Sequence, residues 1–355
     1  MPAVLAKPRK TFLTDYLIVN QVENEGFSNS IKENDSVSLE ATAYALEILK
    51  HYDLYEEPGW FGEIEANVNV SIMEDELLDE LDDKLEKSVI NLYDVHFLLK
   101  SLSLLNATIS SSVEEEIEDF LSRIENTSGG FTPNNMTQEE SMVSTYYALM
   151  VFILLDIDID NKNDHFNWIL SCKNEDDGFG GAPDLSSNIF STYCAVMSIE
   201  ALDSLDDLGG KKDISKYLED FYVDDEGNQD NYGGFLSDEN SKTALLSSTY
   251  YCVEAIRLLD EHELDNQTII DWVLARQNFR DGGFAENTQG TEQKISSLIT
   301  SYYAFQTLQE LDPNLTFLEE EVWRVEFNWI ILIIVLSVLG GLIAVAVIIW
   351  RRRRI

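Results

Sequence analysis

Cysteine is scarce in this chain, and its spacing excludes the common structural zinc sites. The three cysteines, Cys172, Cys194 and Cys252, are far apart and form no C-x-x-C pair, so a zinc finger or ribbon is excluded. Each lies within an apolar helical stretch, where a free cysteine packs as a small hydrophobic residue. The sequence therefore favours three buried thiols over a single disulfide bond.

Basic residues are also few. The chain has 24 lysines and arginines against 65 aspartates and glutamates, a formal net charge of −41 at pH 7. Such a surface repels the phosphates of nucleic acid and anionic lipid headgroups, so nucleic acid is excluded as a partner. The acidity is compatible with a saline habitat or with cation binding, and composition does not separate the two. At 45% hydrophobic residues, a packed domain is expected.

Long stretches of period-two hydrophobicity are missing, so no sheet is expected beyond a short hairpin. The sequence instead repeats a loop in which glycine precedes phenylalanine. The glycine permits the positive φ that ends one helix, and the phenylalanine anchors the loop in the core. The four clearest copies are Gly130-Phe131, Gly178-Phe179, Gly234-Phe235 and Gly283-Phe284.

Each loop is followed by an apolar helical stretch whose Ser or Thr near the start is expected to cap free N–H groups. Looser loops, 25–27 and 59–62, precede two further copies. The steps between equivalent positions are 52, 51, 47, 57 and 52 residues, which indicates six helix pairs in one closed or stacked array. These positions are Thr42, Asp94, Thr145, Thr192, Thr249 and Ser301.

The repeats resemble those of the prenyltransferase β-subunit and squalene/terpene cyclase family. The two best-matching stretches are WILSCKNEDDGFGGAPDLSSNIFSTYCAVMSIEAL (168–202) and WVLARQNFRDGGFAE (272–286), and the similarity covers roughly residues 12–312. The resemblance implies an all-α fold, the α/α toroid, with six inner helices around a cavity and six outer ones.

The resemblance also implies two kinds of catalytic centre, and this sequence lacks the motifs of both. Prenyl-transferring members hold zinc with an Asp-x-Cys pair and a histidine, whereas the aligned positions here are Leu245, Ser247 and Ile299. Cyclases use a DxDD cluster, which does not occur. The nearest acidic runs, around 80–83, 156–160 and 203–207, are interpreted as solvated turns. No zinc site and no other cofactor is therefore predicted.

One acidic run has partial calcium-loop spacing. Its aspartates fall at the first, third, fifth and ninth positions, but Asn161 replaces the expected glycine and Asn167 the bidentate glutamate. An acidic turn between helices is the favoured interpretation, with a weak calcium site as the alternative. The candidate ligands are Asp156, Asp158, Asp160 and Asp164.

A tyrosine recurs at or near one place on each inner helix. By resemblance this region lines the cavity, where aromatic faces would hold an isoprenoid chain or a carbocation. Packing between helices is the favoured alternative. Because neighbouring residues on a helix point about 100° apart, only one member of each Tyr-Tyr pair is expected to face inward. The candidates are Tyr44, Tyr93, Tyr147, Tyr193, Tyr251 and Tyr303.

The end of the sequence predicts a membrane anchor. Residues 329–350 carry no charge and no proline, and as a helix they would span about 33 Å. The predicted organisation is an N-terminal segment (1–11), the toroid (12–318), an acidic juxtamembrane linker (319–328), the transmembrane helix (329–350) and a basic tail (351–355).

The arginine-rich tail favours a cytoplasmic C-terminus and a domain outside the cytoplasm. The start of the sequence shows no signal peptide, so a tail-anchored protein with a cytoplasmic domain is the alternative. Glycosylation sequons fit the outside location. They occur at Asn34, Asn69, Asn106, Asn126, Asn135, Asn266 and Asn314.

Three functions remain open from the sequence. The favoured one is a membrane-anchored toroid that binds an isoprenoid, a glycan or a protein without catalysis. The alternatives are a divergent enzyme of isoprenoid chemistry, by prenyl transfer or cyclisation, and a carbohydrate-active toroid in which acidic pairs would act.

Overall fold

The computed structural model describes residues 3–23, 25–30, 36–54, 68–259, 264–293 and 295–326. The chain divides into two units, one formed by residues 13–315 and the other by the two ends of the chain, 1–12 with 316–355.

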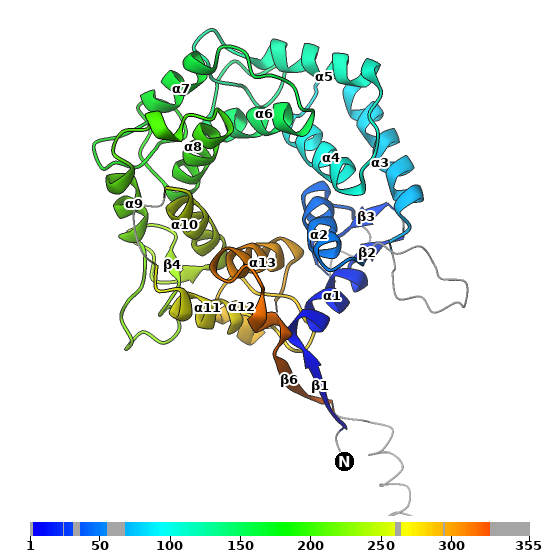
Figure 1. Ribbon diagram of the computed structural model, residues 1–355, viewed down its shortest axis with the longest axis vertical. Helices are drawn as coiled ribbons and strands as arrows, with labels where there is room; N and C mark the ends of the chain where they lie inside the picture. The colour runs from blue at the N-terminus through cyan, green and yellow to red at the C-terminus, as the bar shows by residue number, and fades with distance from the viewer. Residues whose placement is uncertain are drawn as a thin grey trace, which may run out of the picture. The chain divides into compact units, whose positions relative to one another are not determined.

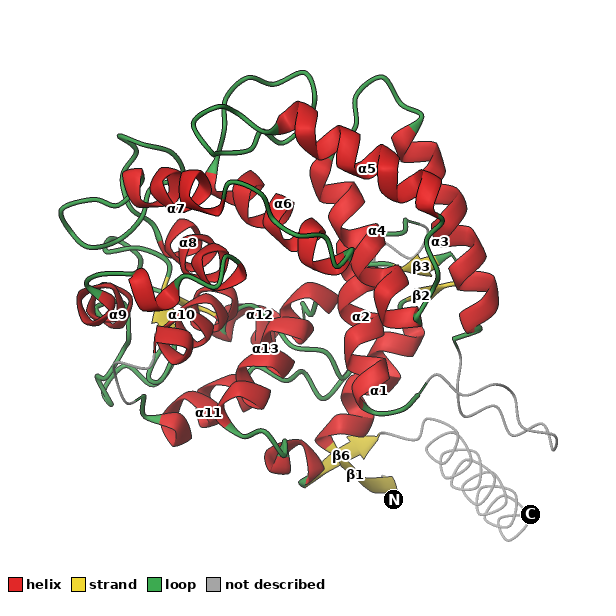
Figure 2. Cartoon of the chain, turned by 45° about the horizontal axis from the view of Figure 1, so that its top comes forward, coloured by secondary structure: helices red, strands yellow, loops and turns green. Residues whose placement is uncertain are grey.

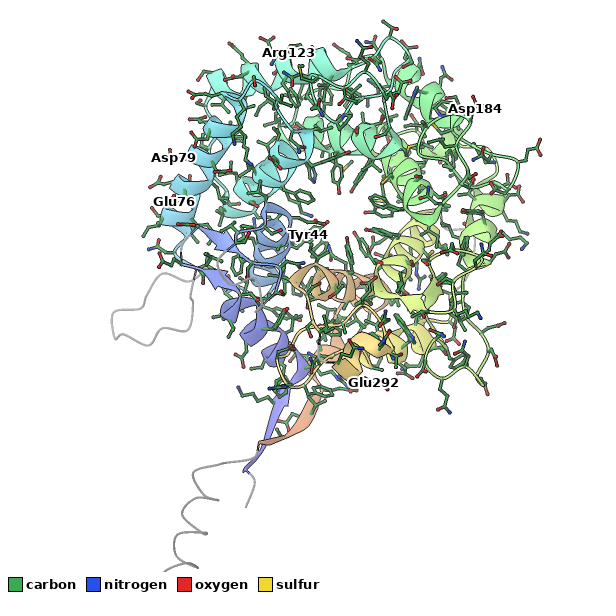
Figure 3. All side chains as sticks on the ribbon, turned by 180° about the vertical axis from the view of Figure 1, so that it is seen from behind. Tyr44, Glu76, Asp79, Arg123, Asp184 and Glu292 are labelled. Atoms are coloured by element: carbon green, nitrogen blue, oxygen red, sulfur yellow. The ribbon has the colours of Figure 1, made fainter. Side chains whose placement is uncertain are left out.

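Six helices of the larger unit form a closed inner ring (Figure 1). Each contacts the next in chain order, and the last contacts the first, so the predicted toroid is confirmed. Figure 3 shows Tyr44 on the inner side of this ring, and Glu76, Asp79 and Arg123 on its outer side. The inner helices are α2 (Leu39–His51), α4 (Leu92–Leu105), α6 (Met142–Leu154), α8 (Ile189–Ala201), α10 (Leu246–Leu259) and α13 (Leu298–Leu311).

A second set of helices surrounds the inner ring (Figure 2). These helices bury a single apolar stripe, as in α5, where Ile117, Phe120, Leu121 and Ile124 follow the i, i+3, i+4, i+7 pattern. The outer helices are α1 (Arg9–Val19), α3 (Val70–Leu85), α5 (Ser111–Ile124), α7 (Lys162–Ser171), α9 (Lys211–Glu219) and α11 (Asn266–Leu274). Short helices α12 (Thr288–Gln293), η2 (Leu205–Asp207) and η3 (Thr316–Glu319) complete the described set.

The repeated Ser or Thr joins each inner helix to its glycine loop. The backbone N–H of Phe179 donates to the hydroxyl of Thr192 at 3.0 Å, and that hydroxyl donates to the carbonyl of the N-cap residue Asn188 at 2.8 Å. The same pair of bonds occurs in four other repeats, at Thr42, Thr145, Thr249 and Ser301. Capping itself comes from residues four positions earlier, such as Asn188 and Ser141. The expected capping role of the repeated Ser or Thr is therefore corrected.

The phenylalanines of the glycine loops are fully buried, as an anchoring role requires. Phe131, Phe179, Phe235 and Phe284 each have 0% exposed surface. Their aromatic rings bury the loop between an inner and an outer helix, so the loops are part of the core of the toroid.

The two glycines of a pair have different tasks, which corrects the prediction of a positive φ at Gly283. The first glycine takes the positive φ, 100° at Gly282, because it reverses the chain after the outer helix. The second glycine permits a close approach: a Cβ at Gly283 would lie 2.7 Å from the Tyr16 ring of α1. A Cβ at Gly130 would likewise come too close to the Trp168 ring of α7. Each loop thus packs on the next outer helix, and the last loop packs on α1, which closes the outer ring.

Strands are few and short, but one pair exceeds the predicted hairpin. In the larger unit β2 (Gln21–Val22) pairs with β3 (Gly26–Phe27), and β4 (Phe235–Leu236) with β5 (Ala244–Leu245). In the smaller unit β1 (Ala3–Pro8) pairs antiparallel with β6 (Glu321–Glu326) over six residues. This pairing cannot be predicted from the sequence, because strands from the two ends of the chain cannot be matched by local periodicity.

The predicted transmembrane segment, 329–350, lies outside the described residues, as does the basic tail. Among the helices within 3–326 that the structure describes, none is long and apolar enough to cross a membrane.

Candidate functional site

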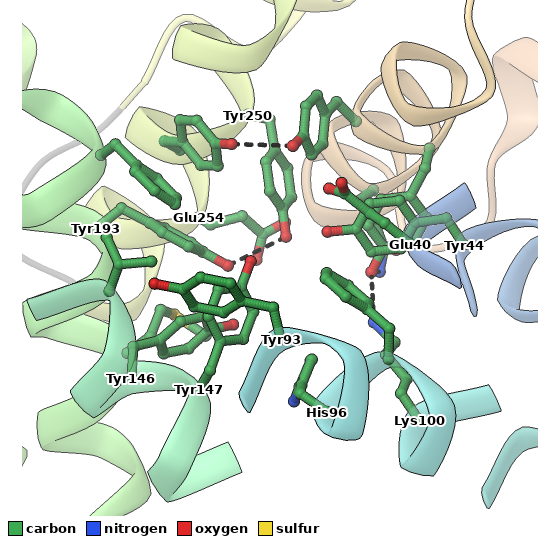
Figure 4. Close-up of a pocket in the computed structure, with 18 residues that line it drawn as sticks. Glu40, Tyr44, Tyr93, His96, Lys100, Tyr146, Tyr147, Tyr193, Tyr250 and Glu254 are labelled. Atoms are coloured by element: carbon green, nitrogen blue, oxygen red, sulfur yellow. Dashed lines mark hydrogen bonds between the residues drawn. The ribbon is translucent and has the colours of Figure 1, made fainter. Parts of the chain in front are cut away.

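The inner ring encloses a cavity of about 570 Å³ whose wall is made largely of tyrosine (Figure 4). Nine tyrosines among the described residues line it. They come from every inner helix, because equivalent positions of a closed repeat face the same axis. The lining tyrosines are Tyr44, Tyr93, Tyr146, Tyr147, Tyr193, Tyr250, Tyr251, Tyr302 and Tyr303.

All six tyrosines singled out in the sequence lie in this wall. The expectation that only one member of each Tyr-Tyr pair faces inward is wrong, since Tyr146, Tyr250 and Tyr302 also line the cavity. The inner helices surround a wide space, so each exposes an arc that exceeds the 100° between adjacent side chains.

The tyrosines pack against one another as well as lining the cavity. The rings of Tyr44 and Tyr302 stack with centroids 3.8 Å apart and planes 1° apart. The hydroxyls of Tyr251 and Tyr303 are hydrogen-bonded at 2.9 Å, and burial raises the pKa of both phenols. The phenols therefore stay protonated at neutral pH. Cavity lining and helix packing, which the sequence presented as alternatives, occur together.

A polar network crosses the cavity wall between α2, α4 and α13. The Lys100 ammonium lies 2.8 Å from the Glu47 carboxylate and donates to the Tyr302 hydroxyl at 3.2 Å. Tyr302 donates to Glu47 at 3.0 Å, and the Gln306 amide donates to the same carboxylate at 2.8 Å. Lys100 is thus already neutralised by its own partner.

Two acidic side chains face the cavity without a basic partner of this kind. Burial raises the pKa of Glu254 to about 8, with smaller contributions from Glu310 and Glu47. Burial also raises the pKa of Glu40, against a hydrogen bond from Tyr44 and the charge of Lys100. Glu254 is therefore largely protonated at neutral pH.

His96 is the histidine of the cavity wall. It is 6% exposed, and its Nδ1 has no hydrogen-bond partner within the described part of the chain. Burial, and then the charge of Lys100, lowers its pKa to about 3, so the imidazole is neutral. Sequence reasoning does not select His96, Lys100 or Glu254, because none of them belongs to a repeated motif.

The positions that align with the family's zinc ligands carry other contacts. The Ser247 hydroxyl donates to Glu286, and the backbone N–H of Ile299 donates to the Asn29 side chain at 3.2 Å. Leu245 lies in β5. Burial raises the pKa of the Cys172, Cys194 and Cys252 thiols, and all three are free.

No group of three or more His, Cys, Asp or Glu side chains could hold a metal ion among the residues that the structure describes. The aspartates of the calcium candidate all lie in described positions and belong to no such group. Asp156 has a φ of 55° directly after α6, and Asp164 lies in the first turn of α7, so the two ends of the run belong to different helices. Calcium binding by Asp156, Asp158, Asp160 and Asp164 stays a prediction.

Some sequons are engaged in the fold. The Asn126 amide donates to Glu140 at 2.8 Å, and the Asn135 amide donates to the carbonyl of Ser88 at 3.2 Å. Asn69 caps α3, and Asn34 lies outside the described residues. Asn106 is exposed and accepts a hydrogen bond from Lys50 at 3.3 Å, and Asn266 is half-buried and accepts one from Arg257. Asn314 is exposed.

The sequence matches one family model along most of its length. The model, described as "Prenyltransferase alpha-alpha toroid domain", covers residues 64–231 and 234–326. The farnesyltransferase β subunit of Pisum sativum is 25% identical over 224 residues, which are 62% of this chain and 49% of that protein. The corresponding Arabidopsis thaliana subunit is 32% identical over 101 residues, 28% of this chain and 21% of that one. The chain thus spans about half the length, or less, of these relatives.

Solved structures share the fold at low sequence identity. The protein geranylgeranyltransferase-I of Candida albicans, complexed with GGPP, has a TM-score of 0.56 at 18% identity over 90% of this chain and 87% of that chain. A variant of the type II terpene cyclase MstE from Scytonema, in complex with geranylgeranyl dihydroxybenzoate, has a TM-score of 0.55 at 11% identity over 86% and 97%.

Proposed function

Because the chain belongs to the prenyltransferase alpha-alpha toroid domain family, we propose that it binds an isoprenoid-type ligand in the tyrosine cavity and does not transfer prenyl groups. The observation that carries the proposal is the cavity itself, about 570 Å³ and lined by nine tyrosines. This volume lies within the range of roughly 300–1,000 Å³ that is usual for small-molecule sites. Aromatic rings offer the large apolar contact that a hydrocarbon chain requires.

The charges of the cavity favour a ligand without a diphosphate. Among the described residues of its wall, Lys100 is the one permanently basic side chain, and Glu47 neutralises it at 2.8 Å. A diphosphate is bound by several lysines or arginines in charge-assisted contacts. Glu40 and Glu254 offer a diphosphate no positive charge, and their ionised forms would repel it.

Two structural relatives contain isoprenoid molecules in the same fold. The Candida albicans enzyme is complexed with GGPP, and the Scytonema cyclase variant with geranylgeranyl dihydroxybenzoate. These ligands support a C20 chain as the first probe for this cavity. A prenyl alcohol is preferred to the diphosphate for the reason given above.

Binding is tested with the full-length chain in a mild detergent and labelled geranylgeraniol. Val143 lines the cavity on α6, while Ile153 on the same helix is 50% exposed. Val143→Trp fills the cavity and is expected to weaken binding at least tenfold, whereas the matched Ile153→Trp leaves it unchanged. Equal binding by the two variants, or preferential binding of geranylgeranyl diphosphate by the wild type, contradicts the proposal.

The proposal includes a membrane anchor at 329–350, with the toroid outside the cytoplasm. Support comes from the uncharged sequence of this segment and the four arginines that follow it. Protease added to intact cells should remove the toroid and spare an epitope at Ile355. Complete protection of the toroid would instead favour the tail-anchored arrangement.

Proton-initiated isoprenoid chemistry is the second candidate, and Glu254 is the observation that favours it. A carboxyl that stays protonated near neutral pH inside an aromatic cavity is a suitable general acid. Its proton would add to a ligand double bond, and loss of another proton from the resulting cation would give an isomer. In deuterium oxide the wild type should yield a deuterated isomer of geranylgeraniol and Glu254→Gln should not. Unlabelled, unchanged geranylgeraniol removes this candidate.

A further inference from the structure

The carboxyl of Glu254 lies in the tyrosine cavity with no partner among the described residues. It projects from α10 one turn beyond Tyr250 and Tyr251, on the same face of the helix (Figure 4). No hydrogen bond or ion pair is formed by this carboxyl with the described residues of the chain. Burial raises the pKa of Tyr146 and Tyr250, and the Glu254 charge adds a smaller contribution to both, so both phenols are near it.

The rings around Glu254 form a continuous aromatic wall. The ring centroids of Tyr193 lie 5.7 Å from Tyr250 and 5.0 Å from Tyr251, and those of Tyr146 and Tyr193 lie 5.9 Å apart. A ring face carries partial negative charge and attracts a cation within about 6 Å of its centroid. A cation in this part of the cavity would therefore contact several tyrosine rings, beside the Glu254 carboxyl.

One charged side chain of the protein already lies close to two tyrosine rings in this cavity. The Lys100 ammonium lies 5.1 Å from the ring centroids of both Tyr44 and Tyr302. Lys100 occupies the α2–α13 side of the cavity and is bound by Glu47. The α6–α8–α10 side has equivalent tyrosines and an equivalent carboxyl, Glu254, but no lysine or arginine in its described wall.

We propose that Glu254 and the surrounding tyrosines form a subsite for a small organic ammonium ion, carried by the ligand of this cavity or by a separate amine. The inference rests on the proposed function in placing a ligand in the same cavity, and it names the charge of that ligand. A metal ion is a poor candidate, because tyrosine faces are not its ligands and one carboxylate is too few. The net charge of −41 would also raise the local concentration of cations.

Binding in this subsite is coupled to a proton. The Glu254 pKa of about 8 means that the carboxyl is mostly neutral at pH 7, and a bound ammonium ion favours its ionised form. Association should therefore strengthen about tenfold per pH unit up to about pH 8 and then level off, with release of about one proton per cation at pH 7.

The other groups that face Glu254 are phenols, one imidazole and further carboxyl groups. The phenols of α6, α8, α10 and α13 have raised pKa values, and the neutral His96 has a lowered one. Across the cavity Glu47 is paired with Lys100, and Glu310 of α13 contributes negative charge. On the outer side of α10, Tyr217 of α9 lies near Cys252. Glu40, whose pKa is also raised, faces the cavity from α2.

The test compares choline with its uncharged isostere 3,3-dimethylbutan-1-ol by calorimetry on the full-length chain in a maltoside detergent. Choline is expected to bind at least tenfold more tightly than the isostere at pH 8.5, with the pH dependence described above. Glu254→Gln is isosteric with the protonated acid, so the fold is preserved. It should reduce choline binding at least tenfold and abolish its pH dependence. Glu200→Gln, at an exposed position of α8, is the matched control.

Equal binding of choline and the isostere, or unchanged choline binding by Glu254→Gln, overturns the inference. Geranylgeraniol binding is measured in parallel on the same protein. If geranylgeraniol binds and choline does not, the proposed function stands and the ammonium subsite fails. If choline binds and geranylgeraniol does not, the subsite stands and the isoprenoid proposal fails. Competition by phosphatidylcholine nanodiscs, but not phosphatidylglycerol ones, would identify a lipid headgroup as the source.

Discussion

Replacing Glu254 with glutamine should change how the stability of the toroid depends on pH. Glu254 has a pKa of about 8 in the folded protein, against 4.5 for an ordinary glutamate carboxyl. Between these values the folded state holds a proton that the unfolded state has lost. Stability contributed by this group therefore falls as pH rises from about 4.5 to 8. Below pH 4.5 the carboxyl is protonated in both states and resembles glutamine.

The size of the effect follows from the shift. One pKa unit corresponds to about 1.4 kcal/mol, so a shift from 4.5 to about 8 corresponds to roughly 4–5 kcal/mol at full ionisation. For a domain of about 300 residues, 1 kcal/mol moves the melting temperature by roughly 1.5–2 °C. Glu254→Gln should therefore melt about 7 °C higher than wild type at pH 9, and at the same temperature at pH 4.

Differential scanning calorimetry of both full-length proteins at pH 4, 6, 7.5 and 9 measures this difference. The other carboxyls are common to both proteins, so subtraction isolates Glu254. Glu200→Gln controls for the loss of one negative charge from a highly acidic chain. Equal melting temperatures of wild type and Glu254→Gln at pH 9 would refute the half-buried position of this carboxyl, away from any basic partner among the described residues.

Three further predictions concern the loops and the missing zinc centre. Gly283→Ala should destabilise the protein by about 1–3 kcal/mol in denaturant titrations, because its Cβ would lie 2.7 Å from the Tyr16 ring. The control Gly181→Ala, whose Cβ would have its nearest contact at 3.7 Å, should change stability by less than about 0.5 kcal/mol. Thr192→Val should destabilise by about 1–3 kcal/mol, since it leaves the buried N–H of Phe179 without an acceptor, and Thr192→Ser should restore most of the loss. Elemental analysis of the full-length chain purified with zinc should find far less than one zinc per chain, because the aligned positions hold two aliphatic residues and a serine; stoichiometric zinc would revive the transferase hypothesis.

The architecture could be predicted from the sequence because its determinants are local and repeated. The helical periodicity, the glycine loops and the buried phenylalanines recur at nearly constant spacing, so each copy supports the interpretation of the others. The anchoring role of Phe284 can be predicted from the sequence of its own loop alone. The close approach at Gly283 cannot be predicted from its own loop, because the Tyr16 ring that excludes a Cβ comes from the opposite end of the toroid sequence.

The character of the site was decided by the tertiary structure. The recurring tyrosines correctly indicate which face of each inner helix lines the cavity. They do not indicate that the second tyrosine of a Tyr-Tyr pair also lines it, because the width of the cavity depends on closing six helices into a ring. Glu254, Glu47 and Lys100 belong to no motif and lie on three different inner helices. The contact between Glu47 and Lys100 depends on which helices meet across the cavity. So does the position of Glu254 away from any lysine or arginine of the described wall. Burial and charge are set by neighbours in space, so a pKa of about 8 at Glu254 exists only in the folded ring.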